Sequence, residues 1–416
     1  MTALGAGTLA VLLWACVGDD SGSPIDAATN DASSNDVMND VTTNDTGTDA
    51  PPASGFSLSL APTHVTADPG DAPVSITIDV HRASGFTDNI NFTVVAPSGV
   101  TASTPPATGT GGTSSSFTLT FTNGAAAGDS TATVTGSNAS ATYVVNAPLG
   151  IHVGSLLAIV DGGVVVPPFA SALNVEAWGG GGGSSSNGSL VSSGGAGGYA
   201  KATIPVTPGE TLVAKVGTGG VGNLSYGAGG GGYTALCPTT GTCLLIAGGG
   251  GGGGGGGDMG PSIGSGGAGG GVVGGAGGPS ATCTNGAGGG TQSAGGTAGA
   301  CNYVGSPGSS LQGGAGVGSA YAAGGVPGGG SGGESGGGGG GGGYFGGAGG
   351  SWDGANGAGG GGGGSGYSSV DGGTLVAGNG AVPPTVDPRC PAGTAVGGTH
   401  EADGGNGCLL IELPKP

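Results

Sequence analysis

Hydrophobic and polar residues alternate strictly in several short segments of the first half of the chain. Phe, Leu, Ile and Val take every second place, with mostly Ser, Thr, Asn and Asp between them, at 56–60, 74–80, 90–94 and 117–121. A period of two places one side of a strand in a core and the other in solvent. Turn residues separate the segments, as between the strands of an antiparallel sheet. The pattern therefore predicts a β-sandwich over residues 55–147.

Two motifs within this stretch point to a known fold. The sequences GFTDNI at 85–90 and APSGVTAS at 96–103 resemble the Ig-like repeats found beside catalytic or binding domains in secreted bacterial proteins. The resemblance implies an Ig-like β-sandwich, and the length of the stretch suits one, since such domains need roughly 90–100 residues. The stretch contains no cysteine, so packing alone must hold its core.

Glycine dominates the sequence after Pro148. The chain has 112 glycines in 416 residues, about four times the ~7% usual in proteins. Hydrophobic segments at 156–160, 164–166 and 172–178 come first, and glycine then prevails to about residue 380. The longest uninterrupted glycine runs are 248–257, 336–343 and 359–364.

Two structures compete for these runs. Gly-rich sequence is ordinarily a flexible linker. The alternative is a lateral array of extended, left-handed glycine helices, in which 248–257 would span ~31 Å. Ordering a residue costs at least ~1 kcal/mol, and a net hydrogen bond returns about as much, so only an array with nearly every backbone group paired is stable. Hydrophobic segments and cysteines punctuate the runs, and a linker needs neither. The sequence favours the array.

The order of motifs gives a second resemblance. The sequence reads VEAWGG at 175–180, GGYAKA at 197–202, TPGETL at 207–212, GGGGYTAL at 229–236, LIAGGG at 245–250 and GGYFGG at 342–347. This order resembles the glycine-rich domain of the anaplastic lymphoma and leukocyte receptor tyrosine kinases and its bacterial relatives. The resemblance implies polyglycine-II-type helices packed with short β-strands. It covers roughly residues 155–416, so we expect a glycine-rich domain at 150–416.

The end of the chain is similar to the closing strand of the bacterial forms. The sequence GGNGCLLIEL at 404–413 carries this similarity. We expect it to pair with 173–178 and so to close the domain end to end. The fold class is therefore all-β. The receptors use this domain in a ligand-binding ectodomain, but this chain has no kinase motif, so only a binding or spacer role carries over.

Large aromatic residues follow several glycine runs. Tyr344 and Phe345 follow the eight-glycine run, and Tyr367 follows the six-glycine run. Together with Trp178 and Trp352 they either cap the ends of the array or form an exposed face that binds a ligand by stacking.

The N-terminus predicts export and anchoring. Residues 1–15 form a short apolar stretch, too short to span a bilayer, that fits a signal peptide. The sequence LWAC at 13–16 resembles the lipobox of bacterial lipoproteins, which implies cleavage before Cys16 and a lipid on its thiol. Eight of the 24 acidic residues lie between Asp19 and Asp49, and this composition predicts a disordered tether at 16–54. A plain secretory signal is the alternative.

Six further cysteines lie in the glycine-rich half. An even number in an exported chain indicates disulfides, with 15 connectivities open to six cysteines. Proximity in sequence favours Cys237–Cys243, Cys283–Cys301 and Cys390–Cys408. A zinc site is excluded because there is no C-x-x-C pair and the four histidines are far apart.

Composition excludes several functions. The net charge is −19 with only five Lys and Arg residues, so the chain lacks the basic surface that nucleic acids require. The pattern G-x-S-x-G at 329–333 has no strand–turn–helix context around it. His400, Glu401 and Asp403 are the nearest acid–base candidates, but no nucleophile accompanies them. We expect no catalytic, cofactor or metal site and no enzyme activity.

These expectations combine into one hypothesis of function. The chain is expected to be a surface-displayed lipoprotein of the bacterial cell envelope, anchored in a membrane by lipid. Its glycine-rich domain would serve adhesion or recognition of an extracellular protein or glycan. The alternatives are a structural spacer without a ligand, an accessory part of a secreted hydrolase system, or a secreted rather than anchored protein.

Overall fold

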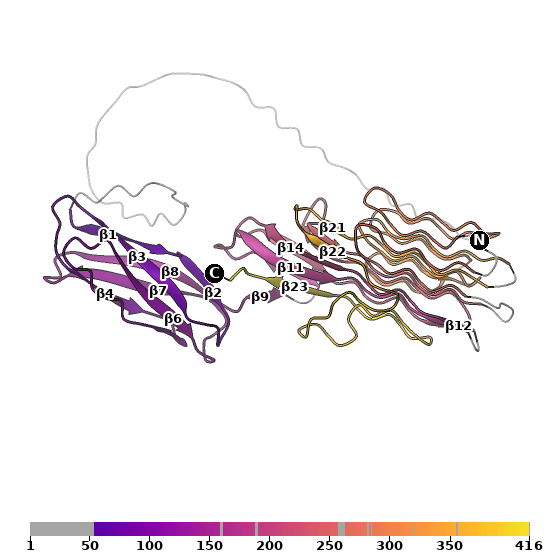
Figure 1. The fold of residues 1–416 in the computed structure, drawn as a ribbon, viewed down its shortest axis with the longest axis horizontal. Helices are drawn as coiled ribbons and strands as arrows, with labels where there is room; N and C mark the ends of the chain where they lie inside the picture. The colour runs from indigo at the N-terminus through magenta and orange to yellow at the C-terminus, as the bar shows by residue number, and fades with distance from the viewer. Residues whose placement is uncertain are drawn as a thin grey trace, which may run out of the picture. The chain divides into compact units, whose positions relative to one another are not determined.

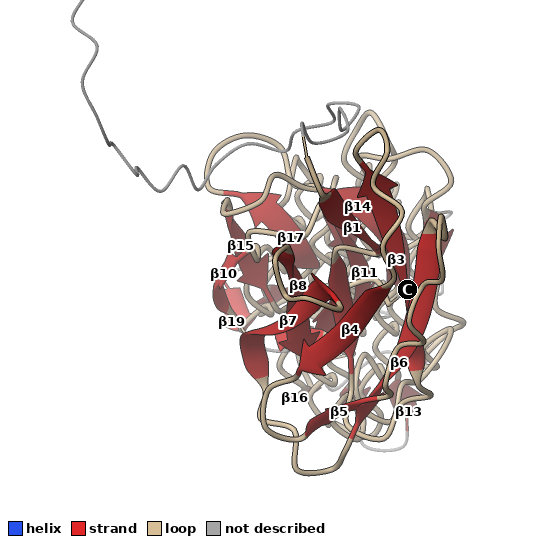
Figure 2. Cartoon of the chain, turned by 90° about the vertical axis from the view of Figure 1, so that its left-hand side faces the viewer, coloured by secondary structure: helices blue, strands red, loops and turns tan. Residues whose placement is uncertain are grey.

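A computed structural model of the chain describes residues 54–158, 161–187, 190–256, 263–280, 283, 285–318, 320–354 and 357–415. The expected signal peptide, Cys16 and nearly all of the expected tether lie outside these residues. Every regular element in the described part is a β-strand, and no helix occurs there (Figure 2). The all-β fold class is thus confirmed. Consistently, no helix in the described part could cross a membrane.

The first domain consists of two four-stranded sheets (Figure 1). One has the order β1-β3-β6-β5, from strands β1 (Phe56–Ala61), β3 (Val74–Arg82), β6 (Ser114–Phe121) and β5 (Val100–Ala102). The other has the order β2-β8-β7-β4, from β2 (His64–Ala67), β8 (Val144–Val153), β7 (Gly128–Asn138) and β4 (Ile90–Val95). All pairs are antiparallel except β2 with β8.

Both sheets contribute to one core. In β3, Ile76, Ile78 and Val80 are buried, with the more exposed Thr77 and Asp79 between them. They share a cluster with Val134 of β7 and other residues of the second sheet. The predicted alternation is therefore the pattern by which each strand faces the core. Strand β8 continues to Val153, so this domain extends past the expected boundary at 147.

The glycine-rich domain contains two five-stranded sheets. One has the order β22-β14-β11-β23-β9, from β22 (Thr374–Val376), β14 (Tyr199–Pro205), β11 (Ala172–Trp178), β23 (Cys408–Glu412) and β9 (Leu156–Ala158). The other has the order β10-β15-β17-β18-β21, from β10 (Gly162–Val165), β15 (Thr211–Lys215), β17 (Thr234–Pro238), β18 (Leu245–Ala247) and β21 (Tyr367–Ser368). Leu173, Val175, Leu212, Leu236 and Ile411 fill the core that they share.

Smaller strands lie among the glycine runs. They are β12 (Ser185–Asn187), β13 (Leu190–Ser192) and β16 (Asn223–Leu224) in one sheet, and β19 (Ala320–Ala322) with β20 (Gly332–Gly333) in another.

The expected closing strand is present. β23 lies antiparallel to β11, with Trp178 opposite Cys408 and Asn174 opposite Glu412. β14 pairs with the other edge of β11, so β11 lies at the centre of this sheet, between β14 and β23.

The glycine runs continue from the strands as a laterally hydrogen-bonded array (Figure 1). In the run after β11, the amides of Gly179 and Gly182 donate to the run 195–198, and those of Gly180 and Gly183 donate to 229–232. The amides of residues 181 and 184 donate to a third run, 402–405. A partner that changes with every residue and recurs at every third indicates three residues per turn.

The longest glycine run lies in the interior of this array. Its amides from 249 to 255 donate to three runs, and its carbonyls from 248 to 253 accept from three others, over distances of 2.7–3.0 Å. The six neighbouring runs are 180–183, 195–198, 228–231, 264–267, 336–342 and 361–364. The backbone groups of this segment are therefore paired on all sides, as the sequence argument requires.

The interior position of these runs explains why they consist of glycine. The runs 336–343 and 359–364 also have six hydrogen-bonded neighbours. A Cβ atom on Gly252 would lie 2.2 Å from the carbonyl oxygen of Ala228, and one on Gly341 would lie 2.1 Å from that of Gly249. Interior runs consist of glycine because neighbouring backbones occupy the space of a side chain.

Three disulfides join the predicted pairs, Cys237–Cys243, Cys283–Cys301 and Cys390–Cys408. The first joins β17 to the segment that leads into β18 and so fixes the turn before the longest glycine run. The third ties the segment before the run 394–398 to the start of β23.

Candidate functional site

Two of the titratable side chains singled out from the sequence, Glu401 and Asp403, bind neighbouring runs of the array. Glu401 accepts a hydrogen bond from the hydroxyl of Ser186. Asp403 Oδ1 accepts one from the amide of Gly222 at 2.8 Å. His400 and Glu401 both have positive φ and form the exposed turn between the runs 394–398 and 402–406. His400 and Glu401 thus belong to a turn, and the hydroxyl of Ser186 links Glu401 to another run.

The G-x-S-x-G pattern lies within the array. Gly332 and Gly333 form β20, and Gly330 donates its amide to the carbonyl of Gly340. The carbonyl of Ser331 accepts the amide of Gly316. This segment is an array run, without the sharp strand-to-helix turn that exposes a nucleophile. Within the described residues, no group of His, Cys, Asp and Glu could hold a metal ion.

Trp178 does not lie on an exposed face. Its side chain is 1% exposed and packs against Tyr199, with ring centroids 4.9 Å apart. Its Nε1 donates to the carbonyl of Thr385 at 3.1 Å. Burial raises the pKa of the Tyr199 hydroxyl, and the hydrogen bond that this hydroxyl donates to Glu176 raises it further. Inclusion of Trp178 in a binding face is therefore wrong, because it belongs to the core at the end of β11.

Tyr344, Phe345 and Tyr367 form one half-buried group. The rings of Tyr344 and Tyr367 stack with centroids 4.2 Å apart, and Phe345 meets Tyr344 edge-on at 5.2 Å. Tyr344 and Tyr367 pack against a buried cluster that includes Tyr233 and Ile246. The three rings are thus half-buried, and two of them pack against the core.

Trp352 belongs to a different, more exposed group. It stacks on Tyr303, with ring centroids 5.1 Å apart and an interplanar angle of 29°. Tyr303 is 53% exposed, and the two residues also form a backbone bridge. Sequence reasoning missed Tyr303 because no long glycine run precedes it.

The outer runs of the array carry side chains at regular intervals. In the run that starts at Gly217, Thr218, Val221 and Leu224 are exposed, whereas Gly217 and Gly220 are buried. In the run 323–326, Ala323 and Val326 are exposed. With three residues per turn, every third side chain points the same way, at intervals of ~9 Å.

These two runs lie side by side at the surface. The amide of Thr218 donates to the carbonyl of Val326 at 2.7 Å, and that of Val221 donates to the carbonyl of Ala323 at 3.0 Å. We call the exposed side chains of Thr218, Val221, Leu224, Ala323 and Val326 the aliphatic face. On the other side of the run 217–222, Asn406 and Asp403 accept the amides of Gly219 and Gly222 and border this face.

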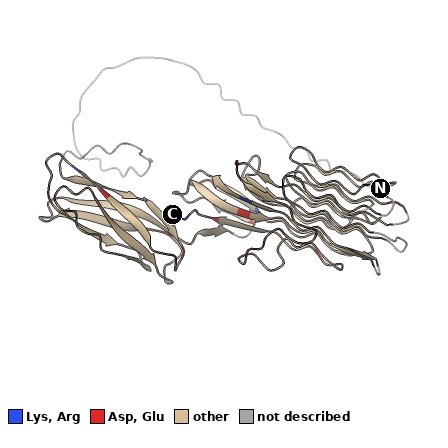
Figure 3. Cartoon of the chain, viewed as in Figure 1, with Lys and Arg blue, Asp and Glu red and all other residues tan. Residues whose placement is uncertain are grey.

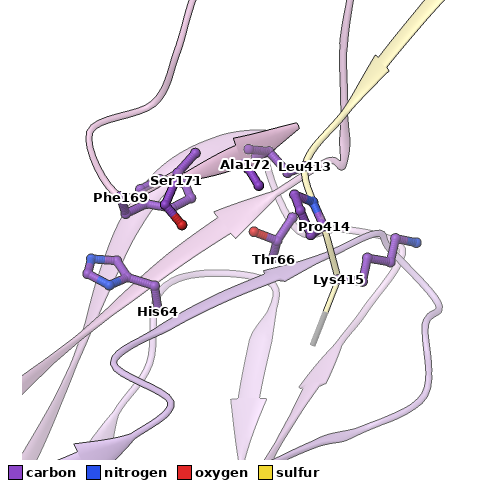
Figure 4. A pocket seen from close by; sticks show the side chains of 9 residues that line it. His64, Thr66, Phe169, Ser171, Ala172, Leu413, Pro414 and Lys415 are labelled. Carbon is purple, nitrogen blue, oxygen red and sulfur yellow. The ribbon is translucent and has the colours of Figure 1, made fainter. Parts of the chain in front are cut away.

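A pocket of about 270 Å³ lies near the C-terminus of the chain (Figure 4). Its walls include His64, Phe169 and Lys415. His64 stacks on Phe169 with ring centroids 5.2 Å apart, and Lys415 Nζ binds Asp68 and Asp71 at 2.7 and 2.8 Å. Burial opposes ionisation of Asp68, but hydrogen bonds from Lys415 and Ser155 hold the pKa of its carboxyl below the usual range. These groups form packing and ion-pair contacts around the pocket, which Thr66 and Ser171 also line.

Comparison with known proteins assigns no family to the chain. No family model matches it, and no curated protein matches it.

Proposed function

We propose that this chain is a lipid-anchored protein of the bacterial cell envelope whose glycine-rich domain has a non-catalytic recognition role. The observation that carries the proposal is the set of exposed apolar side chains fixed on an ordered backbone. Val221, Leu224 and Val326 are 39%, 60% and 66% exposed. A spacer needs only solvated polar residues, whereas exposed apolar groups that cluster usually mark interaction sites.

We also propose finer folds for the two domains. Two sheets around one core, antiparallel except for the pair β2–β8, support an Ig-like sandwich for the first. The three-residue hydrogen-bond period supports polyglycine-II-type helices in the second. The latter agrees with the resemblance to the receptor glycine-rich domains, which serve in a ligand-binding ectodomain.

Recognition is tested with the compact unit Ala50–Pro416. Labelled protein is offered to panels of glycans, extracellular proteins and solid surfaces such as ice and crystalline polysaccharide. We expect saturable binding to at least one of them. A pure spacer would bind none of them, and that result would reject the recognition role.

The anchor is tested separately, since Cys16 lies outside the described residues. We expect the mature chain to begin at Cys16 and to carry lipid on its thiol. Mass spectrometry of membrane-extracted protein should show loss of residues 1–15 and a lipid-sized increase in mass, and Cys16→Ser should abolish both. A soluble mature chain with an unmodified Cys16 thiol would contradict the anchor.

A further inference from the structure

The aliphatic face is flat because of the way its runs pack. The run 217–222 has four hydrogen-bonded neighbours in succession: 323–326, 229–232, 181 and 402–406. Each of these also bonds to the next, through 325 to 230, 180 to 232 and 181 to 405. In an array with six places around each run, four successive neighbours fill half the circle. The outer half is open, and the flanking runs 323–326 and 402–406 lie level with it.

Four of the five side chains of this face are restricted before any ligand arrives. Thr218, Val221 and Val326 are branched at Cβ and have few χ1 rotamers, and Ala323 has none. The backbone amides of Thr218 and Val221 donate to the run 323–326, and that of Val326 donates to the hydroxyl of Thr218 at 2.9 Å. Little conformational entropy remains to be lost on binding.

The chemistry of the face excludes most ligand classes. Its five residues carry no charge, and Asp403 is the acidic residue that borders them. Elsewhere the array holds few Lys, Arg, Asp or Glu residues (Figure 3). With no basic side chain in the face, nucleic acids and anionic lipids gain nothing there. It has none of the aromatic, Met or Arg residues that dominate protein interfaces. It is flat, whereas small molecules bind in concave sites.

A ligand for such a face must itself be flat, uncharged and periodic. The ~9 Å interval along each row is close to twice the shortest repeat in the basal plane of hexagonal ice. Methyl groups do not compete for the hydrogen bonds of a water lattice. The hydroxyl of Thr218 can take part in those hydrogen bonds. Charged side chains would instead hold hydration shells of their own. Many weak, evenly spaced contacts then act together, as in multivalent binding.

We propose that the aliphatic face binds the surface of ice. This inference rests on the proposed recognition role and names its ligand. Through the lipid anchor, the protein would attach the cell to frozen water.

The test uses ice-affinity partitioning and inhibition of ice recrystallisation with the unit Ala50–Pro416. We expect the protein to be enriched in a slowly grown ice phase and to keep ice grains small. Val221→Glu and Val326→Lys place charges within the face and should each lower the enrichment at least tenfold. Val165→Lys is the matched control, because Val165 is 64% exposed on β10 and away from the face, and it should leave enrichment unchanged.

Each outcome decides the proposal. Hydrogen exchange in 249–255 verifies that the variants keep the array intact. Exclusion of the parent protein from ice, or equal enrichment of the parent and both face variants, overturns ice binding. Retention on crystalline cellulose or chitin but not on ice overturns it too, yet leaves the recognition role standing. Binding to nothing in either experiment rejects both.

Discussion

Replacing Gly252 with valine should unfold the glycine array. The new Cβ would lie 2.2 Å from the carbonyl oxygen of Ala228 and 2.7 Å from that of Gly229. Both contacts are to backbone, which cannot rotate away as a side chain can. The runs must separate, and the hydrogen bonds from Gly252 to Gly339 and from Gly361 to Gly252 are then lost. We expect the free energy of unfolding of the array to fall by at least about 4 kcal/mol.

Hydrogen exchange measures this effect. Amides of 249–255 should exchange slowly in the parent protein, because they are paired and shielded. In Gly252→Val they should exchange about a thousandfold faster, which corresponds to ~4 kcal/mol. Gly163→Val is the control, since a Cβ on Gly163 in β10 meets only Thr211 Cγ2, at 3.9 Å. We expect that variant to remain within ~0.5 kcal/mol of the parent. Fast exchange of 249–255 already in the parent protein would show that the runs are a linker.

Replacing Trp178 with alanine should open the closing sheet. Its buried ring packs against Tyr199 and beside the Cys390–Cys408 disulfide. Large-to-small changes of this kind cost ~3–5 kcal/mol, because they leave a cavity as well as removing contacts. The measurement is protection of the β11 and β23 amides, which should fall together because the two strands are paired.

Two further variants separate the effect of the buried ring from that of its hydrogen bond and from that of an aromatic ring elsewhere. Trp178→Phe keeps an aromatic ring but removes the hydrogen bond to Thr385, and it should cost ~1–3 kcal/mol. Trp352→Ala removes a more exposed ring that stacks on Tyr303, and it should leave β11 and β23 protected. Unchanged protection in Trp178→Ala would show that the end of β11 does not depend on this ring.

The sequence predicted the structure where a residue pattern is compatible with only one arrangement of the backbone. Alternation at 74–80 predicted β3, since only a strand brings every second residue to one side. Long glycine runs predicted mutual packing of backbones, and 248–255 has six hydrogen-bonded neighbours. The disulfide pairs followed from short separations of 6 and 18 residues.

It was less successful where tertiary position decides the use of a residue. Trp178 and Trp352 both lie within two residues of glycine. Trp178 is nevertheless buried, beside β23 and Thr385, whereas Trp352 is only half-buried. The aliphatic face was missed because Thr218 and Val326 are 108 residues apart, and local patterning does not show which runs become neighbours. A period of three in the non-glycine positions was the available signal.

The pairing of β11 with β23 also governs when this domain can fold. Asn174 and Glu412 are partners across 412 − 174 = 238 residues of sequence. Contacts of such long range form late and slowly. A chain that emerges N-terminus first can fold its sandwich early, but the sheet of β11 stays incomplete until Glu412 has emerged. During this delay the long glycine stretches limit aggregation, because they expose few apolar side chains through which incomplete chains could associate.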